Sequence, residues 1–140
     1  MKIIVIIMGL QGSGKSTFYM QNLSDEFVRV NLDTLKTRHR ERLLIEECLT
    51  EGRSYAVDNT NPTRADRERY IPQAREAGYR IIGYWIQTKQ DICLQRNALR
   101  EGKARVPDVA IYATSRKCEE PSYAEGFDEL YIVKNDGTLT

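Results

Sequence analysis

The sequence has few of the residues that build metal sites, disulfide frameworks or membrane spans. Its 140 residues include one histidine and three cysteines, Cys48, Cys93 and Cys118, which are widely spaced and form no CxxC pair. A zinc site is therefore not expected, and an odd number of scattered cysteines favours the reducing, cytoplasmic compartment. The longest apolar run, residues 3–8, is too short to span a bilayer and leads into a glycine loop, so we expect neither a membrane span nor a signal peptide.

An excess of charge of one sign is also missing. The chain has 21 basic and 20 acidic residues and a formal net charge of +1. Any contact with a polyanion must then come from a local basic patch and not from a global field. The hydrophobic fraction of 41% is ordinary for a soluble globular protein, and the sequence has no repeat, low-complexity stretch or linker. We expect one domain over residues 1–140.

Apolar segments alternate with helical ones along the chain. Strands are expected at residues 3–8, 27–30, 55–57, 80–86 and 130–133, and helices at 15–23, 34–50, 63–78, 88–100 and 108–118. Capping boxes at Thr63/Asp66 and Thr88/Asp91 would begin two of these helices, and Asp108 would cap another. Strands separated by helices imply right-handed crossovers. The sequence therefore predicts the α/β class, with a five-stranded parallel sheet flanked by helices.

Residues 9–16, GLQGSGKS, match the phosphate-binding pattern G-x-x-x-x-G-K-[ST] in full. An expected strand precedes the motif and an expected helix follows it. The glycines let successive N–H groups face phosphates at the helix N-terminus. Lys15 would reach the β- and γ-phosphates, and Ser16 would offer its hydroxyl to Mg²⁺. The pattern predicts a P-loop NTPase that binds ATP and Mg²⁺.

Two aspartates come at the ends of expected strands, where open α/β sheets bind their ligands. Asp58 follows residues 55–57 and could hold the metal, or could cap its own turn. Asp33 follows residues 27–30 and could accept a proton from a hydroxyl group. Alternatively, Asp33 or Thr34 could merely cap the next helix. The sequence leaves both pairs of alternatives open.

Two basic segments flank these positions. Lys36 and Arg38 begin one turn after Asp33 and could hold an anionic acceptor. Arg96 and Arg100, four residues apart, would share one helical face beside a glycine loop. Arginines that close over a transferring phosphoryl group exclude water and neutralise charge. A small basic lid is therefore expected, although basic residues at a helix end are also favoured by the helix dipole.

Five segments in order, GLQGSGKSTF, VNLDTL, VDNTNPTRADRERY, QRNALREGKARVP and YAEGFDEL, resemble the kinase domain of polynucleotide kinases. The resemblance spans nearly the whole chain and implies transfer of the ATP γ-phosphate to a 5′-hydroxyl of DNA or RNA. A separate phosphatase or ligase partner is also expected. Patterns and resemblance together assign catalysis to Asp33, Lys15 and Arg100; ATP binding to Gly12, Ser13, Gly14, Lys15, Ser16, Thr17, Arg96 and Arg100; Mg²⁺ to Ser16 and Asp58; and the acceptor to Lys36, Arg38, Asp58, Asn59, Thr60 and Asn61.

The chain departs from the family pattern in two places. Leu32 stands where the family often has arginine, so one cation near the site is expected to be missing. Residues 134–140, KNDGTLT, echo the phosphatase motif DxDGTLT with Lys134 at the nucleophile position, which we interpret as a coincidence or a remnant and not as a phosphatase domain. Two alternatives stay open: a small-molecule or nucleotide kinase, and a nucleotide-binding regulatory module without transferase activity.

Overall fold

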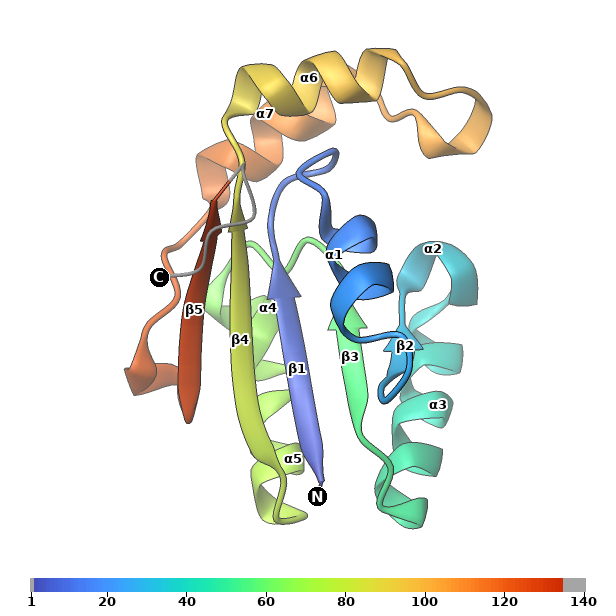
Figure 1. The fold of residues 1–140 in the computed structure, drawn as a ribbon, viewed down its shortest axis with the longest axis vertical. Coiled ribbons are helices and arrows are strands. Elements are labelled where there is room, and N and C mark those ends of the chain that lie inside the picture. The colour runs from blue at the N-terminus through green and yellow to red at the C-terminus, as the bar shows by residue number, and fades with distance from the viewer. Residues whose placement is uncertain (1, 135–140) are drawn as a thin grey trace.

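All five strands run parallel in one sheet, with the order β2-β3-β1-β4-β5 (Figure 1). The computed structural model describes residues 2–134, so the DxDGTLT-like residues 135–140 lie outside the described part. The strands are Ile3–Met8 (β1), Val28–Val30 (β2), Tyr55–Asp58 (β3), Arg80–Gln87 (β4) and Glu129–Lys134 (β5). The predicted α/β fold with a five-stranded parallel sheet is confirmed.

The helices lie on both faces of the sheet and across its carboxyl edge (Figure 1). They are Lys15–Asn22 (α1), Leu32–Leu35 (α2), Arg38–Glu51 (α3), Arg64–Glu68 (α4), Ile71–Glu76 (α5), Gln90–Ala98 (α6) and Asp108–Lys117 (α7), with 3₁₀ turns at Gly102–Ala104 and Tyr123–Glu125. Helices α6 and α7 extend over the carboxyl ends of the strands (Figure 1). Within residues 2–134, no helix combines the length and the apolar character that a membrane crossing needs.

The central strand β1 explains why its residues are continuously apolar. Its side chains alternate between two cores, because successive residues of a strand point to opposite faces. Ile4 and Ile6 pack in the core that includes residues of α3 and α5, whereas Val5 and Ile7 pack with Tyr19 of α1. A strand covered on both faces keeps no polar side, which is the pattern that the sequence shows.

The predicted helix over residues 34–50 is in fact two helices. Helix α2 ends at Leu35, Lys36 has a positive φ of 77°, and α3 starts at Arg38. Thr37 causes the restart, since its hydroxyl accepts a hydrogen bond from the backbone N–H of Arg40 at 3.1 Å.

The predicted helix over residues 63–78 starts as expected but is divided. Thr63 and Asp66 form the predicted capping box at the start of α4. The chain then leaves the helical ladder near Tyr70 and begins α5, with Pro72 in its first turn. Proline lacks an N–H group and its ring disfavours a continuous helix before it, so the sequence itself contains the reason for the break.

The other two predicted caps are wrong. Helix α6 begins at Gln90, and the Thr88 hydroxyl instead donates to the carbonyl oxygen of Ser13 at 2.7 Å. Asp108 lies inside the first turn of α7, after Pro107 at the N-cap position. Thr88 therefore makes a tertiary contact with the glycine loop. The local capping pattern could not indicate this contact.

A buried ion pair joins α4 to the 3₁₀ turn before β5. Arg67 is 1% exposed and donates to both carboxylate oxygens of Glu125, at 2.6 and 3.0 Å. A third bond, 3.0 Å long, goes to the carbonyl oxygen of Asn61. The pair thus fixes the turn after β3 against the segment that leads into β5.

We expect Arg67→Met to lower the free energy of unfolding by about 3–5 kcal/mol, because it leaves the buried Glu125 carboxylate without a partner. Urea denaturation followed by circular dichroism measures this change. The control is Arg80→Met, which breaks an Arg80–Glu129 pair whose side chains are 48% and 31% exposed and which should have little effect. Equal midpoints for the two variants would contradict the assigned role of Arg67.

Candidate active site

A cleft of about 850 Å³ opens at the carboxyl edge of the sheet, between the glycine loop, α2 and the segment after α6. Its lining is richer in positive charge than the chain as a whole, with five basic residues against two acidic ones. These are Lys15, Arg29, Lys36, Arg100 and Lys103, against Asp33 and Asp58. Gly12, Gly14, Ser16, Asn59 and Thr60 also line the cleft. The cleft is suited to anionic ligands.

The backbone of the glycine loop has the conformation that its glycines permit. Gly12 has a φ of 80°, and a Cβ atom there would lie 2.8 Å from the carbonyl oxygen of Cys93. A side chain would be strained and would also clash with α6. Gly14, with a φ of 105°, occupies the N-cap position of α1. The loop therefore leads directly into a helix N-terminus that is open to phosphate groups.

Lys15 lies across the loop that it follows. Its Nζ donates to the carbonyl oxygens of Gly9 at 3.1 Å and Leu10 at 2.9 Å. Burial, with a smaller contribution from nearby Arg100, lowers the pKa of the Lys15 ammonium to about 8, whereas Asp58, Cys93 and Asp33 oppose the shift. A lysine in this condition gains its full charge when an anion binds beside it.

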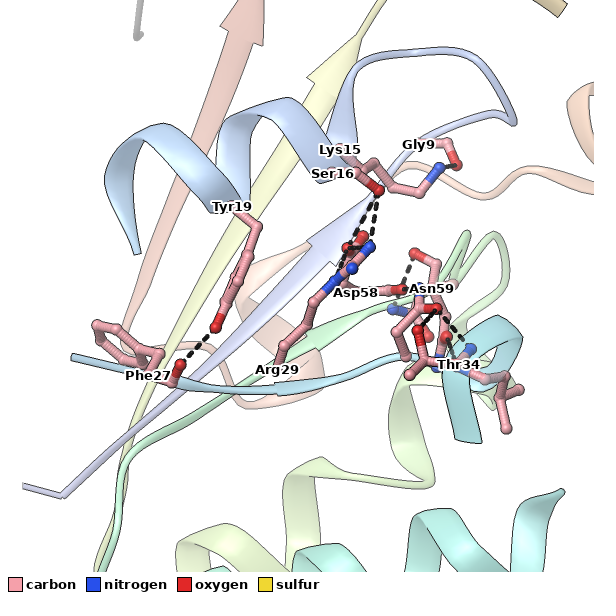
Figure 2. Close-up of polar contacts among 12 residues, drawn as sticks. Gly9, Lys15, Ser16, Tyr19, Phe27, Arg29, Thr34, Asp58 and Asn59 are labelled. Atoms are coloured by element: carbon pink, nitrogen blue, oxygen red, sulfur yellow. Dashed lines mark hydrogen bonds and ion pairs between the residues drawn. The ribbon is translucent and has the colours of Figure 1, made fainter. Parts of the chain in front are cut away.

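The Asp58 carboxylate belongs to a residue that lines the cleft, and it contacts two residues from other elements (Figure 2). It is 1% exposed, and its Oδ2 accepts from Arg29 Nε at 2.8 Å and lies 2.7 Å from Arg29 Nη2. Ser16 Oγ is 3.5 Å from the same oxygen and accepts from Arg29 Nη2 at 2.8 Å. The carboxylate thus faces α1 and β2 instead of capping its own turn.

Ser16 and Asp58 have the chemistry of a divalent-cation site. A hydroxyl and a carboxylate are oxygen donors of the kind that Mg²⁺ uses. Their present partner is the guanidinium of Arg29, so the pair already attracts positive charge. The donor set fits Mg²⁺, and the assignment of the metal to these two residues stays a prediction.

Asp33 lies on α2 with its side chain exposed in the cleft. Neither Asp33 nor Thr34 caps this helix. Asn31 does, because its Oδ1 accepts from the backbone N–H of Thr34 at 3.1 Å and its Nδ2 donates to the carbonyl oxygen of Asp58 at 2.6 Å. Among the described residues, the Asp33 carboxylate takes part in no hydrogen bond. The capping alternative is therefore wrong, and the carboxylate is available to a ligand.

The turn after β3 holds α2 in place through an amide side chain. Asn59 Oδ1 accepts from the backbone N–H of Leu32 at 3.0 Å, and Asn59 Nδ2 donates to Glu41 Oε2 at 3.1 Å. Arg38 is bound to the same glutamate. Its Nη1 donates to Glu41 Oε1 and to the Tyr70 hydroxyl, both at 2.9 Å. The geometry thus gives Arg38 a structural partner and does not support its expected contact with an acceptor.

The next residues of this turn connect it to β1. Thr60 lines the cleft, and its carbonyl oxygen accepts from the backbone N–H of Gly9 at 3.1 Å. Asn61 is buried with a φ of 45°, and its Nδ2 donates to the carbonyl oxygen of Ile7 at 2.8 Å. The turn is short because its side chains bind the neighbouring backbone. The Asn61 side chain binds the backbone of β1 and does not line the cleft, so the structure does not support its predicted contact with an acceptor.

A buried asparagine holds the basic segment that follows α6. Asn97 is fully buried, and its amide both donates to the carbonyl oxygen of Val106 at 2.7 Å and accepts from the Val106 N–H at 3.0 Å. The intervening residues carry exposed Arg100 and Lys103 into the cleft lining. Figure 1 shows this segment extending beyond α6, above α1 and α2. We refer to residues 99–106 as the lid.

Arg96 and Arg100 do not share a helical face, because α6 ends at Ala98. Arg100 lies in the lid, where its Nη1 is 3.4 Å from the carbonyl oxygen of Ala104. Arg96 instead donates to the carbonyl oxygens of Gly12 at 3.3 Å and Ser13 at 3.1 Å. It supports the glycine loop from behind, which corrects the expected pairing of the two arginines.

The structure thus gathers most of the predicted site in one cleft and leaves part of it outside. Ser13 is buried, and Thr17 is exposed on α1. Arg29 was missed by the sequence reasoning, although a single charge inside the apolar strand VRV is a signal that could have found it. Arg29 lines the same cleft as Leu32 and pairs with Asp58.

The model of a known family, described as an AAA domain, matches residues 4–121. The chain belongs to this family.

The chain is also similar to two curated relatives with closely matching descriptions. It is 30% identical over 134 residues to the bifunctional polynucleotide phosphatase/kinase of Schizosaccharomyces pombe, covering 93% of this chain and 33% of the relative. It is 29% identical to the putative bifunctional polynucleotide phosphatase/kinase of Acanthamoeba polyphaga mimivirus, covering 94% of this chain and 33% of the relative. The chain spans about a third of their length. The predicted resemblance to the kinase domain of polynucleotide kinases is confirmed.

Solved structures agree on the fold. An unliganded sugar kinase from Janibacter superposes with a TM-score of 0.71 at 14% identity, covering 99% of this chain and 88% of the sugar kinase. At this identity the likeness concerns the architecture alone. It supports the P-loop fold class predicted from the sequence.

The lowered pKa of Lys15 predicts how nucleotide affinity depends on pH. Above about pH 8 the free protein loses the Lys15 proton, whereas bound phosphate raises the pKa and favours the charged form. Binding then takes up a proton, so the affinity for ATP should fall as the pH rises from 8 to 10. Well below pH 8, where Lys15 is protonated in the free protein as well, this contribution is fully present. Calorimetry in buffers of different ionisation enthalpy measures the proton uptake.

The matched control is Lys15→Met, which cannot titrate. Its affinity should be weaker and should change less between pH 8 and pH 10. A wild-type protein that takes up no proton at pH 9 would contradict the lowered pKa.

Proposed function

We propose that this AAA domain is an ATP-dependent kinase domain that transfers the γ-phosphate to a 5′-hydroxyl end of DNA or RNA. One observation carries the proposal: the Asp33 carboxylate, exposed and without a capping role, faces the same cleft as the glycine loop. A transferase needs both a phosphate-binding loop and an acceptor of the hydroxyl proton. The names of the two curated relatives support the choice of acceptor.

The donor side of the cleft is formed by the glycine loop and α1. Backbone N–H groups around Gly12 and Gly14 would bind the phosphates, with help from the N-terminus of α1. Lys15 would turn from the carbonyl oxygens of Gly9 and Leu10 toward the β- and γ-phosphates. Ser16 and Asp58 would hold Mg²⁺, which neutralises phosphate charge when it is bound.

On the acceptor side, Asp33 would act as the general base. The hydroxyl oxygen of the acceptor forms a bond to the γ-phosphorus, the bond to the leaving ADP oxygen breaks, and the hydroxyl proton passes to the Asp33 carboxylate. Asn31 and Asn59 position α2 through backbone groups, so Asp33 is held by contacts that leave its own side chain free. Precise placement of a base contributes to the rate by lowering the entropic barrier.

The lid would act on the transferring group. Arg100 and Lys103 lie in the cleft lining on the lid side, and Lys36 lies on the opposite side next to Asp33. Arg100 would stabilise negative charge as the phosphoryl group moves, and Lys36 would contact a phosphate of the acceptor strand. Lys36 and Lys103 add positive charge to the cleft beyond the residues proposed to bind ATP, which supports an oligonucleotide over a neutral sugar as acceptor.

A panel of acceptors with labelled ATP tests this function. We expect faster labelling of a 5′-hydroxyl oligonucleotide than of nucleosides or sugars, and none of a 5′-phosphorylated oligonucleotide that has no free 5′-hydroxyl. Faster transfer to a nucleoside or sugar would contradict the polynucleotide kinase proposal and support a small-molecule kinase. ATP binding without transfer to any acceptor would favour the non-catalytic module.

The role of Asp33 has a sharper test. Asp33→Asn keeps the size and polarity of the side chain but cannot accept the proton, so turnover should fall by roughly 10²–10⁴-fold. ATP affinity and the melting temperature should change little, because Asn31 and not Asp33 caps α2. Single-turnover kinetics with saturating ATP and oligonucleotide measures the chemical step.

Asp91→Asn is the matched control, since Asp91 is the second residue of α6 as Asp33 is the second residue of α2. Any effect of removing a charge from a first helical turn should be similar in both. A folded Asp33→Asn protein as active as Asp91→Asn would end the assignment of Asp33 as the base.

A further inference from the structure

The guanidinium of Arg29 occupies the position that the oxygen pair of Ser16 and Asp58 offers to a cation (Figure 2). Its Nη2 is 2.8 Å from Ser16 Oγ and 2.7 Å from Asp58 Oδ2, while its Nε donates to that same carboxylate oxygen at 2.8 Å. One cation thus contacts both oxygens at hydrogen-bond distance. A metal ion that binds the two oxygens directly needs the same space.

Other contacts hold Arg29 in this position. It extends from the middle of β2, and its guanidinium lies 5.6 Å from the centre of the Tyr19 ring. The ring is itself fixed, because the Tyr19 hydroxyl donates to the carbonyl oxygen of Phe27 at 2.6 Å. The Arg29 side chain is 32% exposed, so water reaches it from one side and a path outward is open. Arg29 is therefore positioned beside Ser16 and Asp58 but remains able to move outward.

We propose that Arg29 is a resident cation that competes with Mg²⁺ for Ser16 and Asp58 and so couples metal entry to nucleotide binding. The Asp58 carboxylate is 1% exposed and needs a positive partner in the free protein, which Arg29 provides. Mg²⁺ alone must displace this partner and binds weakly. A nucleotide brings further negative charge into the cleft, which attracts both Mg²⁺ and the displaced guanidinium.

This inference rests on the proposed function only in taking nucleotide and Mg²⁺ as ligands of the cleft. It adds that Mg²⁺ enters with or after the nucleotide, and it assigns this order to Arg29 of β2. If Ser16 and Asp58 are free of Arg29 in only about a tenth of the molecules, the apparent affinity for Mg²⁺ falls about tenfold. Removing Arg29 should therefore increase the affinity for Mg²⁺ in the absence of nucleotide.

The test titrates MgCl₂ into the nucleotide-free protein at constant ionic strength, with binding followed by calorimetry and by the melting temperature. Wild-type protein should show weak binding and a small thermal shift. Arg29→Met leaves Asp58 without its cation, so this variant should melt lower without Mg²⁺, bind Mg²⁺ about tenfold tighter, and recover stability as Mg²⁺ is added.

Three controls separate competition from general effects. Arg80→Met also removes a strand arginine from a carboxylate, at Glu129 outside the cleft, and should gain no affinity for Mg²⁺. Arg29→Lys keeps the charge with fewer donors and should bind Mg²⁺ with an intermediate affinity. In the double variant Arg29→Met, Asp58→Asn, the gained affinity should disappear, which shows that the metal binds at Asp58.

An unchanged affinity for Mg²⁺ in folded Arg29→Met would overturn the inference, as would tighter binding that survives Asp58→Asn. If Arg29→Met folds only when Mg²⁺ is present, the inference is supported. If it folds in neither condition, Arg29→Lys decides, and an affinity equal to wild type overturns the inference. None of these measurements uses an acceptor, so a failed acceptor panel and a failed metal competition are distinguished.

Discussion

The burial of one carboxylate, that of Asp58, is the constraint on which the rest of the cleft depends. A buried negative charge needs a cation or several hydrogen-bond donors, and its partners here come from distant parts of the sequence. Arg29 arrives from β2, Ser16 from the start of α1, and Asn31 binds the Asp58 backbone from the entry to α2. Each of these contacts requires the parallel alignment of β2, β3 and β1. The sheet order thus has a chemical reason as well as a packing reason.

Patterns with a local physical cause could be predicted from the sequence. The glycine loop was predictable because its glycines, lysine and serine act through the backbone of eight consecutive residues, and Gly12 indeed has the positive φ that the motif needs. The continuous apolar run of β1 predicted a strand buried on both faces, which the two cores confirm. The Thr63 capping box was predictable for the same reason, since its partners are three residues apart.

What the sequence did not predict depends on contacts between distant segments. Thr88 resembles a cap but bonds to Ser13, and Arg38 resembles an acceptor contact but is held by Glu41 and Tyr70. Local pattern cannot distinguish a side chain that faces a ligand from one that faces another element. Arg29 shows the converse case: its role became visible only when β2 and β3 were placed side by side.

The proposed donor side of the cleft is formed by backbone groups, and the proposed acceptor side is attached by the amide side chains of Asn31 and Asn59. Helix α2 is anchored to its surroundings through the N–H groups of Leu32 and Thr34, which bind Asn59 and Asn31. Because these anchors use main-chain atoms, the exposed side chain at Lys36 can be exchanged without detaching the helix, whereas the Thr34 hydroxyl also donates to Asn31 Oδ1 at 3.2 Å. Under the proposed function, directed evolution of acceptor preference can be confined to residues 32–36, with the sheet and the glycine loop kept constant.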